Sequence, residues 1–236
     1  MSTPHLLDST APTSRRSFFK KAGFGLGVAA TAVALPACDS DDDDDDADVT
    51  LDFSNDFGVL NYAYALEQLE AAFYAQVLAN PYSGMTSAER AILQDLADHE
   101  AIHRDFLAAA ITQAGGASAL IGDLTPDFSD VDFSDRSSVL TTSLALEDTG
   151  VGAYNGAGRY IDSDTYLLIA GKIVSVEARH ASTIAGIIEA NSIAGSGTID
   201  TNALDLALTP DQVVGRNGRA TPFIQNSIAV INVPSS

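Results

Sequence analysis

The sequence contains two copies of a carboxylate–imidazole pair, Glu100-x-x-His103 and Glu177-x-x-His180. Residues three apart lie on one face of a helix, about one turn from each other, so each pair can direct a carboxylate oxygen and an imidazole nitrogen at one point. The whole chain has only seven Glu and four His, so two such coincidences are not expected by chance. The spacing predicts a site where carboxylates and imidazoles bind metal ions.

Both pairs belong to apolar stripes of a helical pattern, so we expect their side chains to be buried. The stripes consist of Leu93, Leu96, Leu107 and Ala110 around the first pair and Ile173, Ile184 and Ile187 around the second. A buried carboxylate must be paired, protonated or bound to metal, because an isolated charge in an apolar interior is costly. Burial therefore favours metal binding.

A second repeat supplies the other half of the site. Glu67 is followed by Tyr74, and Glu147 by Tyr154, in both cases seven residues later and on nearly the same helical face. The order Glu, Glu-x-x-His, Glu, Glu-x-x-His over four helices is the inward ligand order of di-iron and di-manganese carboxylate bundles. The predicted metal ligands are thus Glu67, Glu100, His103, Glu147, Glu177 and His180.

Three further residues lie close to the predicted ligands. Glu70 shares a face with Glu67, and is either an alternative ligand or a neighbour that supports the ligands. Tyr74 and Tyr154 could hydrogen-bond the ligand carboxylates, but core tyrosines with a satisfied hydroxyl are the simpler interpretation. His99 is predicted to pack, partly buried, on the face of Ile92 and Phe106 rather than join the site. The pattern assigns no catalytic residue.

The donor types and the cysteine count limit the metals. Four ionised carboxylates are neutralised by two divalent cations, and carboxylate with imidazole suits iron or manganese, with zinc still allowed. The only cysteine, Cys38, excludes a disulfide or a cysteine-ligated metal centre within one chain. Any redox chemistry would therefore need an external electron donor.

Four predicted helices must position these residues. Asn80-Pro81 ends the first, Thr86-Ser87-Ala88-Glu89 reads as a capping box that opens the second, and Gly115-Gly116 ends it. Gly150, Gly152 and Gly156 in the third helix would let a neighbouring helix approach closely. The expected ranges are about 56–79, 86–114, 135–158 and 164–190.

The connections predict an all-α fold. The short first loop makes its two helices antiparallel neighbours, whereas residues 117–133 are too many for a tight turn. We therefore expect a four-helix bundle over 54–192, made of two antiparallel hairpins joined by a long crossover. In the extension, 193–236, Thr209-Pro210-Asp211-Gln212 predicts a short capped helix that packs across the bundle.

The N-terminal residues are typical of an export signal. Ser14-Arg15-Arg16-Ser17-Phe18-Phe19-Lys20 resembles a twin-arginine signal, followed by an apolar run of small residues, 22–37. Leu35-Pro36-Ala37-Cys38 resembles a lipobox, which predicts cleavage of 1–37 and acylation of Cys38. Residues 38–53, with an unbroken run of Asp, are expected to form an acidic tether. The expected location is periplasmic or on the cell surface, with a membrane as partner through the lipid.

The formal net charge of −20 argues against nucleic acid as a partner. A homodimer is compatible with the pattern, whereas a closed storage cage is opposed by a tethered N-terminus.

Three segments carry a resemblance to a known family. They are Leu60-Asn61-Tyr62-Ala63-Tyr64-Ala65-Leu66-Glu67-Gln68-Leu69-Glu70-Ala71-Ala72-Phe73-Tyr74, Leu146-Glu147-Asp148-Thr149-Gly150-Val151-Gly152-Ala153-Tyr154 and Val176-Glu177-Ala178-Arg179-His180-Ala181. On these segments, residues 57–191 resemble the ferritin-like superfamily and, more narrowly, the ferritin-like proteins grouped with plant desiccation-related proteins. The resemblance implies the bundle and a metal site, but no particular reaction.

Two functions follow as hypotheses. The first is an exported di-iron or di-manganese oxidoreductase that acts on oxygen or peroxide, with ferroxidase-like or catalase-like chemistry. The second is a non-catalytic envelope protein related to stress or desiccation, in which the metal site is structural or vestigial.

Overall fold

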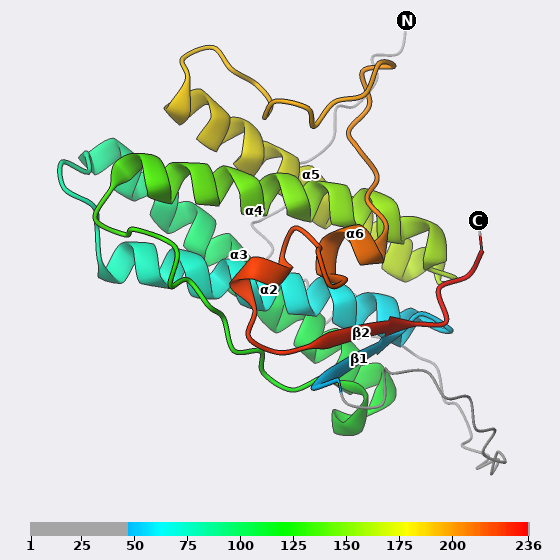
Figure 1. Ribbon diagram of the computed structural model, residues 1–236. Helices are drawn as coiled ribbons and strands as arrows, with labels where there is room; N and C mark the ends of the chain where they lie inside the picture. Colours follow the sequence, from blue (N-terminus) through cyan, green and yellow to red (C-terminus); the bar gives the residue numbers. More distant parts are fainter. Residues whose placement is uncertain (1–46, 236) are drawn as a thin grey trace, which may run out of the picture. The chain divides into compact units, whose positions relative to one another are not determined.

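The computed structural model describes residues 47–235, which form two helical hairpins packed side by side (Figure 1). The proposed signal, Cys38 and most of the acidic tether lie outside the described residues. The four long helices are α2 (Asp56–Ala79), α3 (Ser87–Gly115), α4 (Arg136–Ala157) and α5 (Asp164–Ile188). The predicted all-α four-helix bundle is confirmed, and each long helix ends within two residues of its expected bounds.

Side-chain caps set where three of the four long helices, α2, α3 and α4, begin. The Asn55 side chain accepts from the Phe57 N–H at 2.9 Å, and Asp135 accepts from the Ser138 N–H at 2.7 Å. At the start of α3, Thr86 and Glu89 form the predicted capping box. Such caps satisfy N–H groups that have no partner within the helix, so the local sequence fixes these helix ends.

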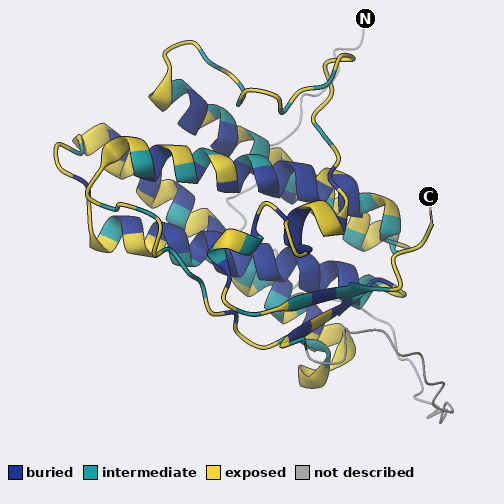
Figure 2. Cartoon of the chain, viewed as in Figure 1, coloured by how far each residue is buried: buried dark blue, intermediate teal, exposed yellow. Residues whose placement is uncertain are grey.

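The hairpins pack through their apolar faces. α2 packs mainly on α3, and α4 on α5, while α2 and α4 bring the two hairpins together. Figure 2 shows the buried faces of these helices turned toward one another. α2 is buried around most of its circumference, because the crossover and the short strand that precedes α2 cover sides that the other helices leave open.

The crossover, predicted over 117–133, spans residues 116–135 between α3 and α4 and contains one short 3-10 turn, η1 (Ala117–Ala119). Two buried amides of α2 hold it in place. The Asn61 side chain donates to the Ala119 carbonyl at 2.7 Å and accepts from the Ile121 N–H at 3.0 Å, and Gln68 accepts from the Leu124 N–H at 2.9 Å. These bonds satisfy crossover backbone groups that have no helix or sheet partner.

A short parallel strand pair corrects the expected tether boundary. β1 (Val49–Asp52) pairs with β2 (Ile228–Ile231), with Val49 opposite Ile228. Val49, Leu51 and Phe53 are all buried. They alternate with polar residues as a half-buried strand requires, but the preceding aspartate run masked this period of two. Residues 49–53 therefore belong to the folded domain rather than to a tether.

The C-terminal extension packs across the bundle, as expected. It contains the short helix α6 (Pro210–Val214), which begins with the predicted capping box of Thr209 and Gln212 (Figure 1). Gly152 and Gly156 of α4 admit this extension rather than a neighbouring helix, which corrects the prediction at these two positions. The Leu208 N–H donates to the Gly152 carbonyl at 2.9 Å, and a Cβ at Gly156 would lie 1.6 Å from the Leu208 carbonyl oxygen.

Two more 3-10 turns complete the described chain, η2 (Gly158–Tyr160) and η3 (Thr221–Phe223). Among the helices of residues 47–235, none is both long enough and apolar enough to cross a membrane.

Candidate metal centre

The structure brings all six predicted ligands together in the bundle core. They form two groups, and within each group one ligand atom from every member lies within 4.8 Å of the others. We define position A as the group Glu67, Glu100, His103 and Glu177. Position B is the group Glu100, Glu147, Glu177 and His180. Glu100 and Glu177 belong to both groups, so they can bridge two ions.

In each group a histidine Nδ1 faces three carboxylates. Nδ1 of His103 lies 3.1 Å from Oε1 of Glu177, 3.3 Å from Oε2 of Glu100 and 3.4 Å from Oε2 of Glu67.

Around position B the spacing is less even. Nδ1 of His180 lies 2.7 Å from Oε1 of Glu100, 3.3 Å from Oε2 of Glu147 and 4.0 Å from Oε2 of Glu177. Three oxygens around one nitrogen is a donor set that divalent iron, manganese or zinc accepts.

The burial of these groups tests whether they fit a metal. All four ligand carboxylates have an exposed fraction of zero. Six of the facing atoms have no hydrogen-bond partner within residues 47–235: Oε2 of Glu67, Oε1 of Glu100, Oε2 of Glu147, both oxygens of Glu177 and Nδ1 of His180. Buried polar atoms without partners are rare and costly, and cations between them would satisfy all six. The residues present therefore fit a pair of metal ions.

The charges inside the cluster shift its ionisation. Burial and the neighbouring Glu100 charge raise the pKa of Glu67 to about 7. Burial also raises the pKa of Glu147, and that of Glu177 well above its usual value. The pKa of Glu100 falls to about 2, because its contacts with His103 and His180 outweigh the effect of burial.

The pKa values of the two histidines are also raised, but by the neighbouring charges and against the effect of burial. The facing carboxylates overcome burial and raise the pKa of His103 to about 12 and that of His180 to about 10. Without metal, protons on these groups must therefore carry the compensating charge.

Each tyrosine of the repeat bonds a ligand on the opposite hairpin. The Tyr154 hydroxyl donates to Oε1 of Glu67 at 2.5 Å. The Tyr74 hydroxyl donates to Oε1 of Glu147 and lies 2.6 Å from the Ser143 hydroxyl. The simpler interpretation as plain core tyrosines was therefore wrong, since both hydroxyls hold predicted ligands.

Glu70 is buried beside the six ligands but belongs to neither group. A Cβ at Gly150 would lie 3.0 Å from Oε1 of Glu70 and 3.5 Å from Oε2 of Glu177, so the missing side chain makes room for this fifth carboxylate. Burial and the nearby Glu177 charge raise the pKa of Glu70 well above its usual value. A protonated Glu70 leaves four ionised carboxylates to balance two divalent ions.

His99 does not pack as the sequence analysis predicted. It is exposed on α3, and its Nδ1 lies 2.9 Å from Nε2 of His180, with the two rings stacked at 5.1 Å. His180 thus faces the carboxylates with one nitrogen and His99 with the other. In the sequence, the only sign of this role is that His99 precedes Glu100. The role becomes clear only when the structure places His99 of α3 opposite His180 of α5.

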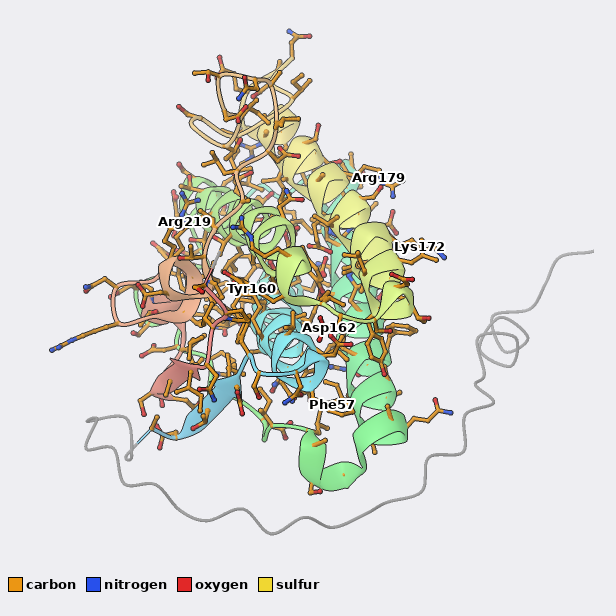
Figure 3. All side chains as sticks on the ribbon, turned by 90° about the vertical axis from the view of Figure 1, so that its right-hand side faces the viewer. Phe57, Tyr160, Asp162, Lys172, Arg179 and Arg219 are labelled. Carbon is orange, nitrogen blue, oxygen red and sulfur yellow. The ribbon has the colours of Figure 1, made fainter. Side chains whose placement is uncertain are left out.

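The flanking basic residues of α5 stay outside the cluster. Figure 3 shows Lys172 and Arg179 pointing away from the bundle, and Arg179 donates to the Ser175 carbonyl of its own helix at 3.0 Å.

The fold and this site define a helical bundle with a buried carboxylate–histidine cluster. Residues 55–190 match the family model of the ferritin-like domain, which covers more than half of the chain. The chain belongs to this ferritin-like domain family. The matched span begins at the cap of α2, ends just beyond α5 and contains all six predicted ligands. No curated protein shows a significant sequence match to the chain.

Proposed function

We propose that this ferritin-like domain binds two divalent metal ions and carries out redox chemistry on dioxygen or peroxide. The proposal rests on the buried carboxylate and imidazole atoms that face one another and have no hydrogen-bond partner among the described residues. Oxygen and nitrogen donors favour iron or manganese.

The residues divide the work of holding the ions. Glu67 and His103 would bind at position A, Glu147 and His180 at position B, and Glu100 and Glu177 would bridge both. Iron or manganese held by these residues would supply the electrons that the oxidant takes up. The Tyr154 and Tyr74 hydroxyls hold the two terminal carboxylates from the opposite hairpin and orient them.

The cellular setting is part of the same proposal. The twin-arginine pattern supports export, and the lipobox pattern supports a lipid anchor at Cys38. Export after folding suits a metalloprotein, since the metal can be loaded before translocation. A redox role would also require an external electron donor, because the single cysteine, Cys38, cannot form a cysteine-ligated metal centre within one chain.

Elemental analysis tests the metal site, and turnover tests the reaction. Protein purified from its native host should contain about two ions of iron or manganese per chain. The matched control replaces Glu100, Glu147 and Glu177 with Gln, which keeps side-chain shape but removes the charges. Metal-free wild-type protein, or equal metal in the control, would defeat the proposal.

Turnover then separates the enzyme from the non-catalytic alternative. Loaded protein should release oxygen from peroxide, or oxidise added Fe(II) with dioxygen, faster than the control. In the second reaction, dioxygen accepts two electrons, one from each of two Fe(II) ions. It also accepts two protons and leaves as hydrogen peroxide. Tightly bound metal with neither reaction would instead indicate a structural site in a stress-protective envelope protein.

A further inference from the structure

An apolar cavity of about 20 Å³ lies inside the bundle next to position A. Three of its wall residues come from helices that carry position A ligands, each one helical turn beyond its ligand. They are Ala63, four residues before Glu67; Leu107, four after His103; and Ile173, four before Glu177. Residues four apart share a helical face, so the cavity adjoins position A directly.

Tyr154 forms the wall between this cavity and the ligands. Its ring lines the cavity while its hydroxyl donates to Glu67. Tyr154 retains an exposed fraction of 8%, whereas its counterpart Tyr74 has 0%. The two halves of the repeat differ beside these tyrosines. Tyr74 contacts the Ser143 hydroxyl, whereas the position on α2 equivalent to Ser143 is Ala63, which has no hydroxyl and leaves space beside Tyr154.

The opposite end of the site is closed. The residues one turn beyond the position B ligands are Ser143, Ile184 and Leu96, and all three are buried. Further along the same face of α3 comes Leu93, also buried, seven residues before Glu100. The equivalent position on α5, seven before Glu177, is the cavity residue Ala170. Smaller side chains thus leave space at one end of the site that larger ones fill at the other.

The far side of the cavity approaches the surface. Its outer wall includes Gly158, Ile161 and Tyr166, all partly exposed, around the connection from α4 to α5. The same connection is tied to the start of α2 by the Asp162 N–H, which donates to Asp56 at 2.7 Å (Figure 3). The cavity therefore lies between position A and this end of the bundle.

We propose that this cavity binds dioxygen and delivers it to position A, so that the oxidant reaches the metal pair from one end only. The proposal rests on the proposed function and names dioxygen rather than peroxide as the substrate.

The wall chemistry favours dioxygen as the occupant. The walls are aliphatic and aromatic, and their hydroxyls are those of Tyr154, which already donates to Glu67, of Tyr62 and, in the outer wall, of Tyr166. A buried water or peroxide needs about two to four hydrogen-bond partners, so the Tyr62 and Tyr166 hydroxyls together would supply only the lower end of that need. Dioxygen loses no hydrogen bonds on transfer and is small enough for a space of this size.

Binding can be measured on metal-free protein, because dioxygen is paramagnetic and speeds the relaxation of nearby nuclei. Methyl spectra would be recorded under dioxygen and under the same pressure of nitrogen. We expect relaxation of the Ala63, Leu107 and Ile173 methyls to increase severalfold more than that of Leu96 and Ile184, which are equally buried at the closed end. Equal effects at the two ends would overturn the proposal.

A substitution taken from the closed end gives the matched test. Ala170→Leu places at the open end the residue found at position 93, and Ala170→Phe still narrows the cavity if leucine turns outward. Gly171→Leu is the control, since position 171 is exposed and a Cβ there meets nothing within 4 Å. We expect the Ala170 variants, but not the control, to lose the dioxygen effect on the Ala63 methyl.

The same variants separate this inference from the proposed function. If the protein binds Fe(II), the Ala170 variants should bind it as the wild type does but react with dioxygen severalfold more slowly. An unchanged rate in both variants, despite loss of the relaxation effect, would overturn delivery through the cavity and leave the metal site intact. Failure to bind any metal would defeat the proposed function, while the relaxation experiment would still decide whether the cavity holds dioxygen.

Discussion

The two histidines of the buried cluster, His103 and His180, differ in what lies behind them. Both point Nδ1 at carboxylates, which leaves Nε2 for an outer partner, and His180 has such a partner in His99. The equivalent residue on α5, one before Glu177, is Val176, which offers no hydrogen bond to His103. An outer hydrogen bond fixes the tautomer and orientation of a ligand histidine, so His99 should favour metal at position B.

We therefore predict that His99→Ala weakens binding of one of the two ions by about 10- to 100-fold and leaves the other nearly unchanged. Calorimetric titration with Mn²⁺ would resolve the two steps. Asp98→Ala is the control, because Asp98 is an exposed neighbour that contacts Gln94 on its own helix. A loss shared equally by both ions would show that His99 supports the fold rather than one ligand.

The choice between Glu67 and Glu70 can be settled by charge removal. Glu67→Gln should cost more metal affinity than Glu70→Gln, because only Glu67 joins a ligand group, whereas the raised pKa of Glu70 favours its neutral form. Metal content after dialysis against a weak chelator measures the difference. The reverse order would make Glu70 the ligand on α2.

The convergence of the six predicted ligands could be inferred from sequence, because helical spacing alone puts them on shared faces. His99 and Gly150 could not, because their roles depend on contacts across helices. His99 contacts a residue 81 positions away, and Gly150 matters only through the Glu70 carboxylate opposite it. Sequence periodicity reports which face a residue occupies, but not what the facing helix presents.

At the scale of elements, the helices were predictable and the strand pair was not. Helix ends carry local signals, such as the capping box at Thr86 and the Asn80-Pro81 stop. β1 and β2 pair across about three quarters of the chain, and each has only four residues. Such short strands leave little periodicity, and their pairing depends on tertiary packing, of β1 on α2 and of β2 on α6, rather than on propensity.

The close approach of the C-terminal extension to α4 gives a prediction at this scale. Gly156→Ala should lower the free energy of unfolding by about 1–3 kcal/mol, because its Cβ would collide with backbone at Leu208. Limited proteolysis should then cut the extension faster. The control Gly171→Ala meets no neighbour and should raise stability by up to about 1 kcal/mol through helix propensity. Equal behaviour of the two variants would contradict the packing role of Gly156.

For the whole molecule, the N-terminal pattern predicts a dependence on the arginine pair. Replacing Arg15 and Arg16 together by Lys should leave the precursor in the cytoplasm, because the twin-arginine receptor reads the pair and not positive charge alone. Cell fractionation measures the outcome, with substitution of Lys21 by Arg as the charge-neutral control. Normal export of the double variant would refute the targeting proposal.

The metal cluster also predicts how stability of the whole domain depends on pH. Without metal, Glu67 has a pKa of about 7 in the fold, above its unfolded value near 4.5. The native state then holds more protons than the unfolded state between these values, so stability falls as pH rises from about 4.5 to 7. In the fold, the pKa of His103 is about 12 and that of His180 about 10, above their unfolded value near 6.5. The protonated histidines therefore stabilise the fold fully below about pH 6.5, and this stabilisation is lost as the pH rises toward 10 and 12.

Both groups act in the same direction, so metal-free protein should be more stable near pH 5 than near pH 8. Glu100, with a pKa of about 2, opposes this only in stronger acid, where its stabilising charge is lost. Bound metal replaces the protons, and an excess of about a thousandfold over the dissociation constant contributes about 4 kcal/mol. For a domain of this size that corresponds to roughly 10 °C in melting temperature. Melting curves with and without chelator should therefore diverge at pH 8 and converge toward pH 5.

The control replaces Glu100, Glu147 and Glu177 with Gln, which removes three of the buried carboxylates without changing their shape. That variant should melt at the same temperature with and without metal and depend less on pH than metal-free wild type, because fewer like charges face one another. Suppose instead that chelation leaves the wild-type melting temperature unchanged at every pH while the triple variant unfolds. The glutamates would then serve packing and hydrogen bonding, and the dinuclear site would be wrong.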